Sequence, residues 1–162
     1  MERILKRIAE SKWQSRVLKL LSQLSALAGI AAYGALLYLA YKSSINELAF
    51  LLVAAGAPFV LVTLFRHLVN APRPYETYDF YQTPPKNKCG KSFPSRHVFS
   101  GFVIATLAFA YSLPLALVML GFAVILAVSR VLLGIHFIRD VVCGALVGVV
   151  SGVIGIVIFN LI

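Results

Sequence analysis

Charged residues are scarce in this sequence. Of its 162 residues only 13% are charged, whereas 60% are hydrophobic, and the mean hydropathy is +0.88. Because ordinary soluble domains carry roughly 25% charged residues, this composition excludes a water-soluble globular protein. A membrane-spanning helix needs about 20 apolar residues. We therefore expect an all-α fold, a polytopic membrane helical bundle that forms a single domain over residues 1–162.

Acidic residues and cysteines are also few. Six acidic residues face 15 basic ones, which gives a formal net charge of +9. The basic residues lie at the chain ends and in loops, and no nucleic-acid-binding motif is present, so we interpret them as topology signals and expect no nucleic-acid partner. Cys89 and Cys143 have no spacing typical of a disulfide or a metal site. We predict neither a metal nor a cofactor, and an ordinary thiol at Cys89, although nearby lysines would favour a lowered pKa.

Apolar runs predict about five membrane-spanning helices. Their approximate ranges are Leu18 to Tyr41, Leu48 to Val69, His97 to Ser112, Leu115 to Leu133 and Val141 to Leu161. A polar turn from Lys42 to Glu47 joins the first two spans. The stretch between Ala71 and Pro94 holds Pro72, Pro74, Pro84 and Pro85, so we predict a loop without helix there.

Residues 1–16 combine apolar residues at helical spacing with dense basic charge, which is too much charge for a span. We predict an amphipathic helix that lies in the membrane interface, and a frayed basic tail is the alternative. In the last span, Gly144, Gly148 and Gly152 recur on one helix face, which allows close helix packing. Packing within the bundle is the preferred interpretation, and a homodimer face is the alternative.

Counting the spans places three polar segments on one side of the membrane. They are the N-terminus, the loop 66–97 and the junction 129–140. Arginines and histidines that gather at span ends predict an anion site, because guanidinium groups bind phosphate oxygens in pairs. The residues on this side include Arg66, His67, Arg73, Ser95, Arg96, His97, Ser129, Arg130, His136 and Asp140.

His136 and Asp140 are four residues apart. If the last helix has begun there, the carboxylate can accept a hydrogen bond from one ring nitrogen and leave the other free. A histidine oriented in this way is suited to act as a nucleophile or a base.

Three motifs in order give these residues a family resemblance. The segment 129–140 contains S-R-x5-H-x3-D as Ser129, Arg130, His136 and Asp140; residues 94–97 read P-S-R-H, close to P-S-G-H; and Arg66 with Arg73 and Pro74 is close to K-x6-R-P. The chain thus resembles the phosphatidic acid phosphatase type 2 family, which also includes vanadium haloperoxidases. The motifs span residues 66–140.

The resemblance implies a role for each motif residue. His136 would attack phosphorus and form a phosphohistidine, with Asp140 orienting it. His97 would protonate the leaving oxygen and then activate water. Four further motif residues, Arg66, Arg73, Ser95 and Arg130, would bind the phosphate oxygens. Arg96 is an additional candidate for phosphate binding.

Two positions depart from the family pattern. Arg66 stands where a lysine is usual, which keeps the charge but changes the geometry of the donor group. Arg96 stands where a glycine is usual, and it adds a cation beside His97. The family is also six-span, whereas this sequence predicts an interfacial segment in place of the first span.

The sequence therefore predicts a metal-independent membrane phosphatase whose partners are the lipid bilayer and a lipid phosphate. Candidate substrates are undecaprenyl pyrophosphate, phosphatidylglycerol phosphate and phosphatidic acid. A non-catalytic anion-binding membrane component and a vanadate-dependent haloperoxidase-like enzyme are the alternatives. The active site is expected on the side of the N-terminus in a multi-pass cell-membrane protein. The basic residues 3–19, with Lys86 and Lys88, against Lys42 on the other side favour a cytoplasmic site.

Overall fold

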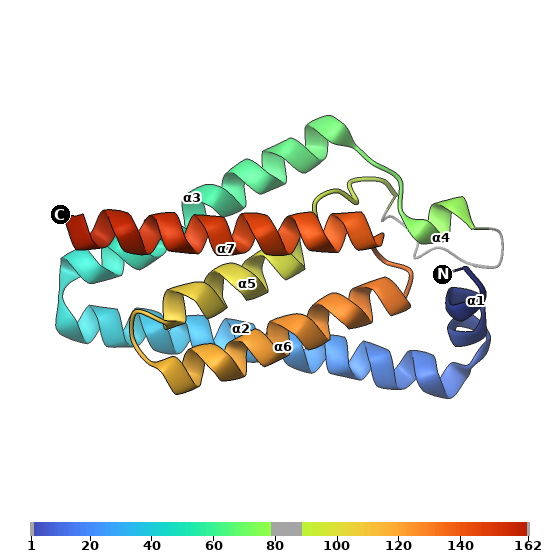
Figure 1. Ribbon diagram of the computed structural model, residues 1–162, viewed down its shortest axis with the longest axis horizontal. Coiled ribbons are helices and arrows are strands. Elements are labelled where there is room, and N and C mark those ends of the chain that lie inside the picture. The colour runs from blue at the N-terminus through green and yellow to red at the C-terminus, as the bar shows by residue number, and fades with distance from the viewer. Residues whose placement is uncertain (1, 79–88, 162) are drawn as a thin grey trace.

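The computed structural model describes residues 2–78 and 89–161. Over these residues the chain is a bundle of seven helices without a strand, which confirms the predicted helical membrane bundle. The helices are α1 (Glu2–Glu10), α2 (Lys12–Ser43), α3 (Ile45–Val69), α4 (Pro74–Thr77), α5 (Arg96–Ala108), α6 (Leu113–Leu132) and α7 (Ile138–Leu161). Figure 1 shows that the longer helices run side by side along the bundle.

Serine caps divide the apolar runs into separate helices. Ser44 ends α2, since its amide donates to Ala40 O at 2.9 Å, and it also begins α3, since its Oγ accepts from the amide of Glu47 at 3.1 Å. The break between the first two spans is therefore one residue, shorter than the predicted turn from Lys42 to Glu47. Ser112 caps α6 in the same way, and Pro114 lies in the first turn of that helix, where no backbone donor is needed.

Four helices are long and apolar enough to cross a membrane, as judged from the described residues. The helix at the predicted third span is shorter than expected. This helix, α5, has 13 residues and ends at Ala108, four residues before the predicted end at Ser112. At about 1.5 Å per residue, such a helix is shorter than the hydrocarbon layer of about 30 Å. A turn over residues 109–111 follows α5, and α6 begins at Leu113.

The short helix α5 forms the centre of the bundle, packed against α2, α3, α6 and α7. Phe99, Val103 and Leu107 on α5 are almost fully buried. The outer helices expose large apolar side chains instead, among them Leu61 at 65% and Leu146 at 61%. Since soluble proteins do not expose apolar faces of this extent, these surfaces face lipid.

The glycines of α7 are used inside the bundle. A Cβ on Gly148 would lie 2.7 Å from Phe99 O, and one on Gly152 would lie 2.6 Å from Thr106 Cβ, so both allow α5 to approach α7 closely. Packing within the bundle is thus confirmed. The structure does not support the alternative, a homodimer face through Gly144, Gly148 and Gly152, because Ser95 and α5 of the same chain already lie against these glycines.

Three polar segments meet at one end of the bundle, as the span count predicts. Figure 1 shows α1, α4 and the junction between α6 and α7 at the same end, with the C-terminus at the other. The predicted interfacial segment 1–16 is two elements in the structure, since Ser11 separates α1 from α2. Leu5 of α1 is buried, and α1 packs against α2 and α6.

Candidate active site

Two arginines hold the loop that precedes α5. Arg66, near the end of α3, donates from Nη1 to Pro94 O at 2.9 Å and from Nη2 to Lys91 O. Arg73, just before α4, donates from Nε to Gly90 O at 2.9 Å. Both residues of the first motif therefore position the loop, in addition to any contact with phosphate.

The predicted loop 71–94 contains a helical turn that helps Arg73. Pro74 starts the four-residue helix α4, a position where proline is tolerated, so the prediction of no helix in this stretch is wrong. Glu76 accepts from the amide of Arg73 at 2.7 Å and from the amide of Gly90 at 2.9 and 3.0 Å. Glu76 thus links the segment at Arg73 to the segment at Gly90. The sequence patterns did not identify Glu76.

The second motif packs directly on α7. Ser95 is fully buried, and its amide donates to Asp140 O at 2.8 Å. Gly144 permits this contact, since a Cβ there would lie 2.6 Å from Ser95 O. The second and third motifs are therefore in direct contact.

His136 and Asp140 form the buried centre of the site, with side chains 2% and 0% exposed. His136 Nδ1 lies 3.6 Å from Asp140 Oδ2. Because α7 begins at Ile138, His136 precedes the helix, so the condition for a shared helix face is not met. The carboxylate is also held by the amide of Phe137, which donates to Oδ2 at 3.0 Å.

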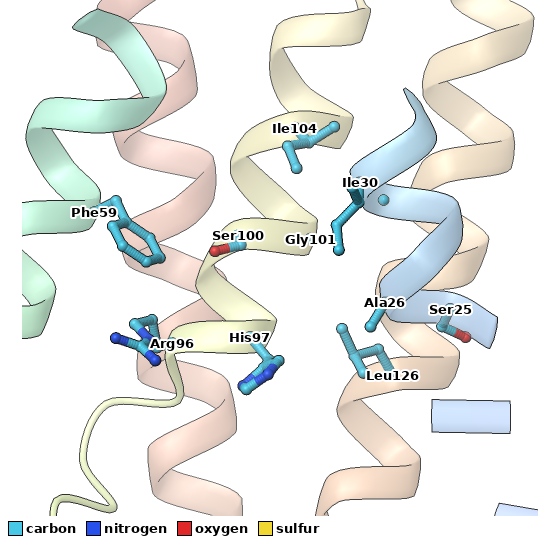
Figure 2. Close-up of a pocket in the computed structure, with 11 residues that line it drawn as sticks. Ser25, Ala26, Ile30, Phe59, Arg96, His97, Ser100, Gly101, Ile104 and Leu126 are labelled. Carbon is cyan, nitrogen blue, oxygen red and sulfur yellow. The ribbon is translucent and has the colours of Figure 1, made fainter. Parts of the chain in front are cut away.

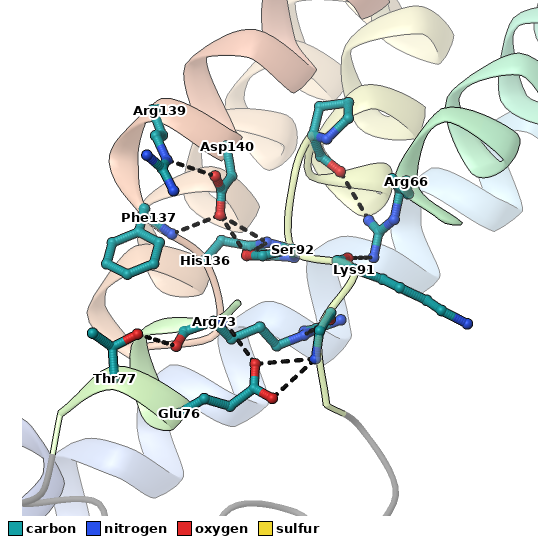
Figure 3. A network of polar contacts seen from close by, with 12 residues as sticks. Arg66, Arg73, Glu76, Thr77, Lys91, Ser92, His136, Phe137, Arg139 and Asp140 are labelled. Atoms are coloured by element: carbon teal, nitrogen blue, oxygen red, sulfur yellow. Dashed lines mark hydrogen bonds and ion pairs between the residues drawn. The ribbon is translucent and has the colours of Figure 1, made fainter. Parts of the chain in front are cut away.

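Ser92 joins this pair and was missed by the sequence analysis. Its side chain is fully buried, and its Oγ lies 3.2 Å from His136 Nδ1 and 2.5 Å from Asp140 Oδ2 (Figure 3). A serine two residues before a motif carries no signal in one sequence. Only the folded loop places it beside a histidine that is 44 residues away.

His136 is held as a neutral base. Burial lowers its pKa below the ordinary value, and this effect exceeds the opposite influence of Asp140. A neutral imidazole has one nitrogen with a free lone pair, as a nucleophile requires. The contacts of Nδ1 leave that role to Nε2.

Two buried donors of the site have no hydrogen-bond partner among the described residues. They are the Oγ of Ser95 and the Nε of Arg130. Buried donors are costly when unpaired, and a phosphoryl group offers several acceptor oxygens. Arg130 lies in the last turn of α6, and its carbonyl accepts from the amide of His136 at 3.3 Å, so the backbones of these two residues are tied together.

His97 lies in the first turn of α5, within electrostatic reach of His136, Arg130, Arg66 and Arg96. The structure thus brings all predicted site residues to one end of the bundle. Arg96 is the peripheral member, because its guanidinium lies over the ring of Phe59 on α3, 5.2 Å from the ring centre. Figure 2 shows Arg96 and His97 side by side at the start of α5.

An apolar groove leads away from His97 and Arg96. A cavity of about 220 Å³ contains both residues together with Gly29, Phe59 and Ser100 (Figure 2). A second cavity of about 340 Å³ shares Phe59 and Ser100 with it and continues between α2, α3 and α5 toward Tyr33 and Gly56. Two neighbouring cavities with mostly apolar linings therefore lie beside His97 and Arg96, within the bundle.

The described residues hold no cluster of three or more histidine, cysteine or carboxylate side chains that could bind a metal ion.

Comparisons with known proteins agree with this architecture. The crystal structure of LpxE from Aquifex aeolicus superimposes with a TM-score of 0.71 at 23% identity, covering 95% of this chain and 91% of LpxE. The crystal structure of a transmembrane PAP2 type phosphatidylglycerolphosphate phosphatase from Bacillus subtilis gives a TM-score of 0.70 at 23% identity, covering 98% and 84% of the two chains. At this identity the likeness shows a shared fold.

A comparison with curated protein sequences gives no match. The model of the PAP2 superfamily, however, matches residues 46–161, which include all three motifs and helices α3 to α7. The chain therefore belongs to the PAP2 superfamily.

Proposed function

We propose that this protein is a membrane lipid phosphatase that hydrolyses a phosphomonoester or a pyrophosphate of a lipid through a phosphohistidine. The observation that carries the proposal is the buried group of His136, Ser92 and Asp140. Near this group lie His97 and two donors, Ser95 Oγ and Arg130 Nε, that have no hydrogen-bond partner among the described residues. The name of one structural relative, a PAP2 type phosphatidylglycerolphosphate phosphatase, fits this class.

In the first step, Nε2 of His136 attacks phosphorus and the bond from phosphorus to the lipid oxygen breaks. His97 gives a proton to the departing oxygen, so the lipid leaves as an alcohol or as a monophosphate. In the second step, His97 takes a proton from water, the water oxygen attacks phosphorus, and the bond to Nε2 breaks. Inorganic phosphate is released and His136 returns to its neutral form.

Charge that develops on the three outer phosphate oxygens needs donors fixed in advance. Ser95 Oγ and Arg130 Nε are suited to this role because they are buried and have no partner among the described residues. Arg66 and Arg73 each use part of their guanidinium on the loop and keep further N–H groups for phosphate.

The groove between α2, α3 and α5 supports a lipid substrate. It starts at His97 and is lined farther on by apolar side chains, so a hydrocarbon tail can lie there while its phosphate reaches His136. Gly29 and Gly56 line the groove with open space around each Cβ position. Gly29→Leu is expected to raise KM for a long-chain lipid phosphate by about tenfold and to leave a short-chain analogue unaffected.

The substrate candidates are undecaprenyl pyrophosphate, phosphatidylglycerol phosphate and phosphatidic acid. Arg96 favours a lipid with a second anionic group, because it is a half-buried cation at the mouth of the groove, where such a group would lie between the reacting phosphate and the tail. A pyrophosphate carrier lipid and a phosphatidylglycerol phosphate both meet this requirement.

We place the active site on the cytoplasmic face. Residues 3–19 contribute six basic residues at this end of the described chain, whereas Lys42 lies at the other end. Lys86 and Lys88, which the sequence argument also used, lie outside the described residues.

Labelling of a Cys143→Ser variant in intact cells tests this orientation. Cys89 is exposed, and its hydrogen bond to Glu76 raises the pKa of its thiol, so labelling is done at mildly alkaline pH. An impermeant maleimide should modify Cys89 only after the cells are opened. Equal labelling of intact cells would place the site outside.

Phosphate release by the purified protein tests the activity itself. A panel of lipid monophosphates and pyrophosphates in detergent, with EDTA and without added metal, should give turnover that His136→Ala abolishes. Absence of turnover on every lipid would favour the non-catalytic alternative, and strict dependence on magnesium would contradict the metal-independent mechanism.

A further inference from the structure

Ser92 stands between the nucleophile and its carboxylate partner. Nδ1 of His136 and Oδ2 of Asp140 are 3.6 Å apart, which is too long for a good hydrogen bond, whereas Ser92 Oγ lies 3.2 Å from the first atom and 2.5 Å from the second. The shortest polar path from the ring to the carboxylate therefore runs through the serine hydroxyl.

The direction of the two hydrogen bonds follows from the donors available. An ionised carboxylate accepts only, so the Ser92 hydroxyl donates its single hydrogen to Asp140 Oδ2. A lone pair on Ser92 Oγ is then left to accept from Nδ1–H of His136. This order assigns the ring hydrogen to Nδ1 and leaves Nε2 unprotonated.

The position of the hydroxyl is fixed by the backbone around it. The amide of Ser92 donates to Ala71 O at 2.9 Å, and the carbonyl of the preceding Lys91 accepts from Arg66. On the other side, Asp140 is held by the amide of Phe137. Ser92 and Asp140 thus come from separately anchored segments, and their contact depends on the loop before α5.

We propose that Ser92 is a positioning residue that fixes the tautomer and the ring orientation of His136 by linking Nδ1–H to Asp140. The proposal rests on the proposed function, in which His136 attacks phosphorus. No proton has to leave Nδ1 during the reaction. As the bond from Nε2 to phosphorus forms and the lipid oxygen departs, the ring gains positive charge, and Asp140 stabilises that charge through Ser92.

Other charged groups also act on His136, so charge alone cannot identify the role of Ser92. They are Arg66 on α3, Arg73 before α4, His97 on α5 and Asp140 on α7. Ser92→Ala changes none of these charges. Its effect on rate and on the pH profile therefore reports the hydrogen-bonded link.

Ser92→Ala is expected to lower kcat by about 10- to 100-fold, the usual effect of removing a hydrogen bond to a charged group, with KM changed less than about threefold. The acid limb of the pH profile should move to lower pH, because the protonated ring loses its acceptor at Nδ1. Ser22→Ala, at another buried serine, is the matched control and should retain normal kinetics.

A double-mutant cycle with Asp140→Asn separates this role from a general loss of structure. If Ser92 acts through Asp140, then Ser92→Ala should cost less than about threefold in the Asp140→Asn background. The same 10- to 100-fold loss in both backgrounds, or wild-type kcat in Ser92→Ala alone, would overturn the proposal. Should Ser92→Ala lack a cooperative thermal transition, Ser92→Cys replaces it in the cycle, since sulfur is a much weaker hydrogen-bonding group.

His136→Ala, measured in parallel, keeps the two proposals apart. Loss of turnover in His136→Ala with normal kinetics in Ser92→Ala contradicts only the role of Ser92. Full turnover in His136→Ala contradicts the proposed function itself.

Discussion

The amide of Ser95 donates a 2.8 Å hydrogen bond to the carbonyl oxygen of Asp140, and this bond joins the second motif to the third. Gly144, one turn farther along α7, leaves room for it, because a Cβ there would lie 2.6 Å from Ser95 O. The clash would be with backbone, which a side-chain rotation cannot relieve. Gly144→Ala is therefore expected to separate α5 from α7 and lower kcat by about tenfold or more.

Gly121→Ala is the matched control for this change. Gly121 also lies within a helix, α6, and nothing lies within 4 Å of its Cβ position. Alanine should there preserve kcat and stabilise the helix by about 0.5–1 kcal/mol. Equal kcat values in the two variants, measured as phosphate release, would show that the close approach at Gly144 is not needed.

Arg66 supplies a second prediction, because it holds two carbonyl groups of the loop before α5 with separate nitrogens. Arg66→Ala should lower kcat by about 100-fold or more and lower the melting temperature as well. Arg66→Lys should recover part of the activity, since one ammonium keeps the charge but cannot reproduce the planar fork. Identical losses in both variants would mean that the fork geometry alone matters.

The sequence predicted which residues come together at one end of the bundle more completely than it predicted the helix boundaries. Motif spacing identified His136, Asp140 and His97, and the span count placed them at one end of the bundle. The length of α5 could not be predicted, because an apolar run does not show where a buried helix gives way to a turn. Ser92 and Glu76 could not be identified either, since their partners come together only when the loop folds against α3 and α7.

The pH dependence of kcat/KM provides a third prediction. Burial lowers the pKa of His136 below 6.5, so the nucleophile loses its free lone pair only when the pH falls below that value. The acid limb should lie below pH 6.5 in the wild type. It should move farther to the acid side in Asp140→Asn, because Asp140 raises the pKa of His136. An acid limb above 6.5 that Asp140→Asn leaves in place would assign the titration to another group.

Arg96 gives a prediction about substrate preference. Its guanidinium lies over Phe59 and lines the same cavity as His97, at a place suited to a second phosphate. Arg96→Gly should raise KM for a pyrophosphate lipid by about tenfold and for the matching monophosphate by much less. Arg16→Gln, which removes an exposed cation of α2, should change neither KM. An equal rise for both lipids would reduce the role of Arg96 to general attraction of anions.

Trapping of the phosphoenzyme tests the central claim most directly. His97→Ala removes the group that activates water, so a substrate with an activated leaving group, such as an aryl phosphate, should load phosphate onto His136 faster than water removes it. After quenching in alkali, which preserves phosphohistidine, the account predicts radioactive phosphate on the His97→Ala protein and none on the His97→Ala/His136→Ala double variant. Equal labelling of the two proteins, or turnover that persists without His136, would contradict it.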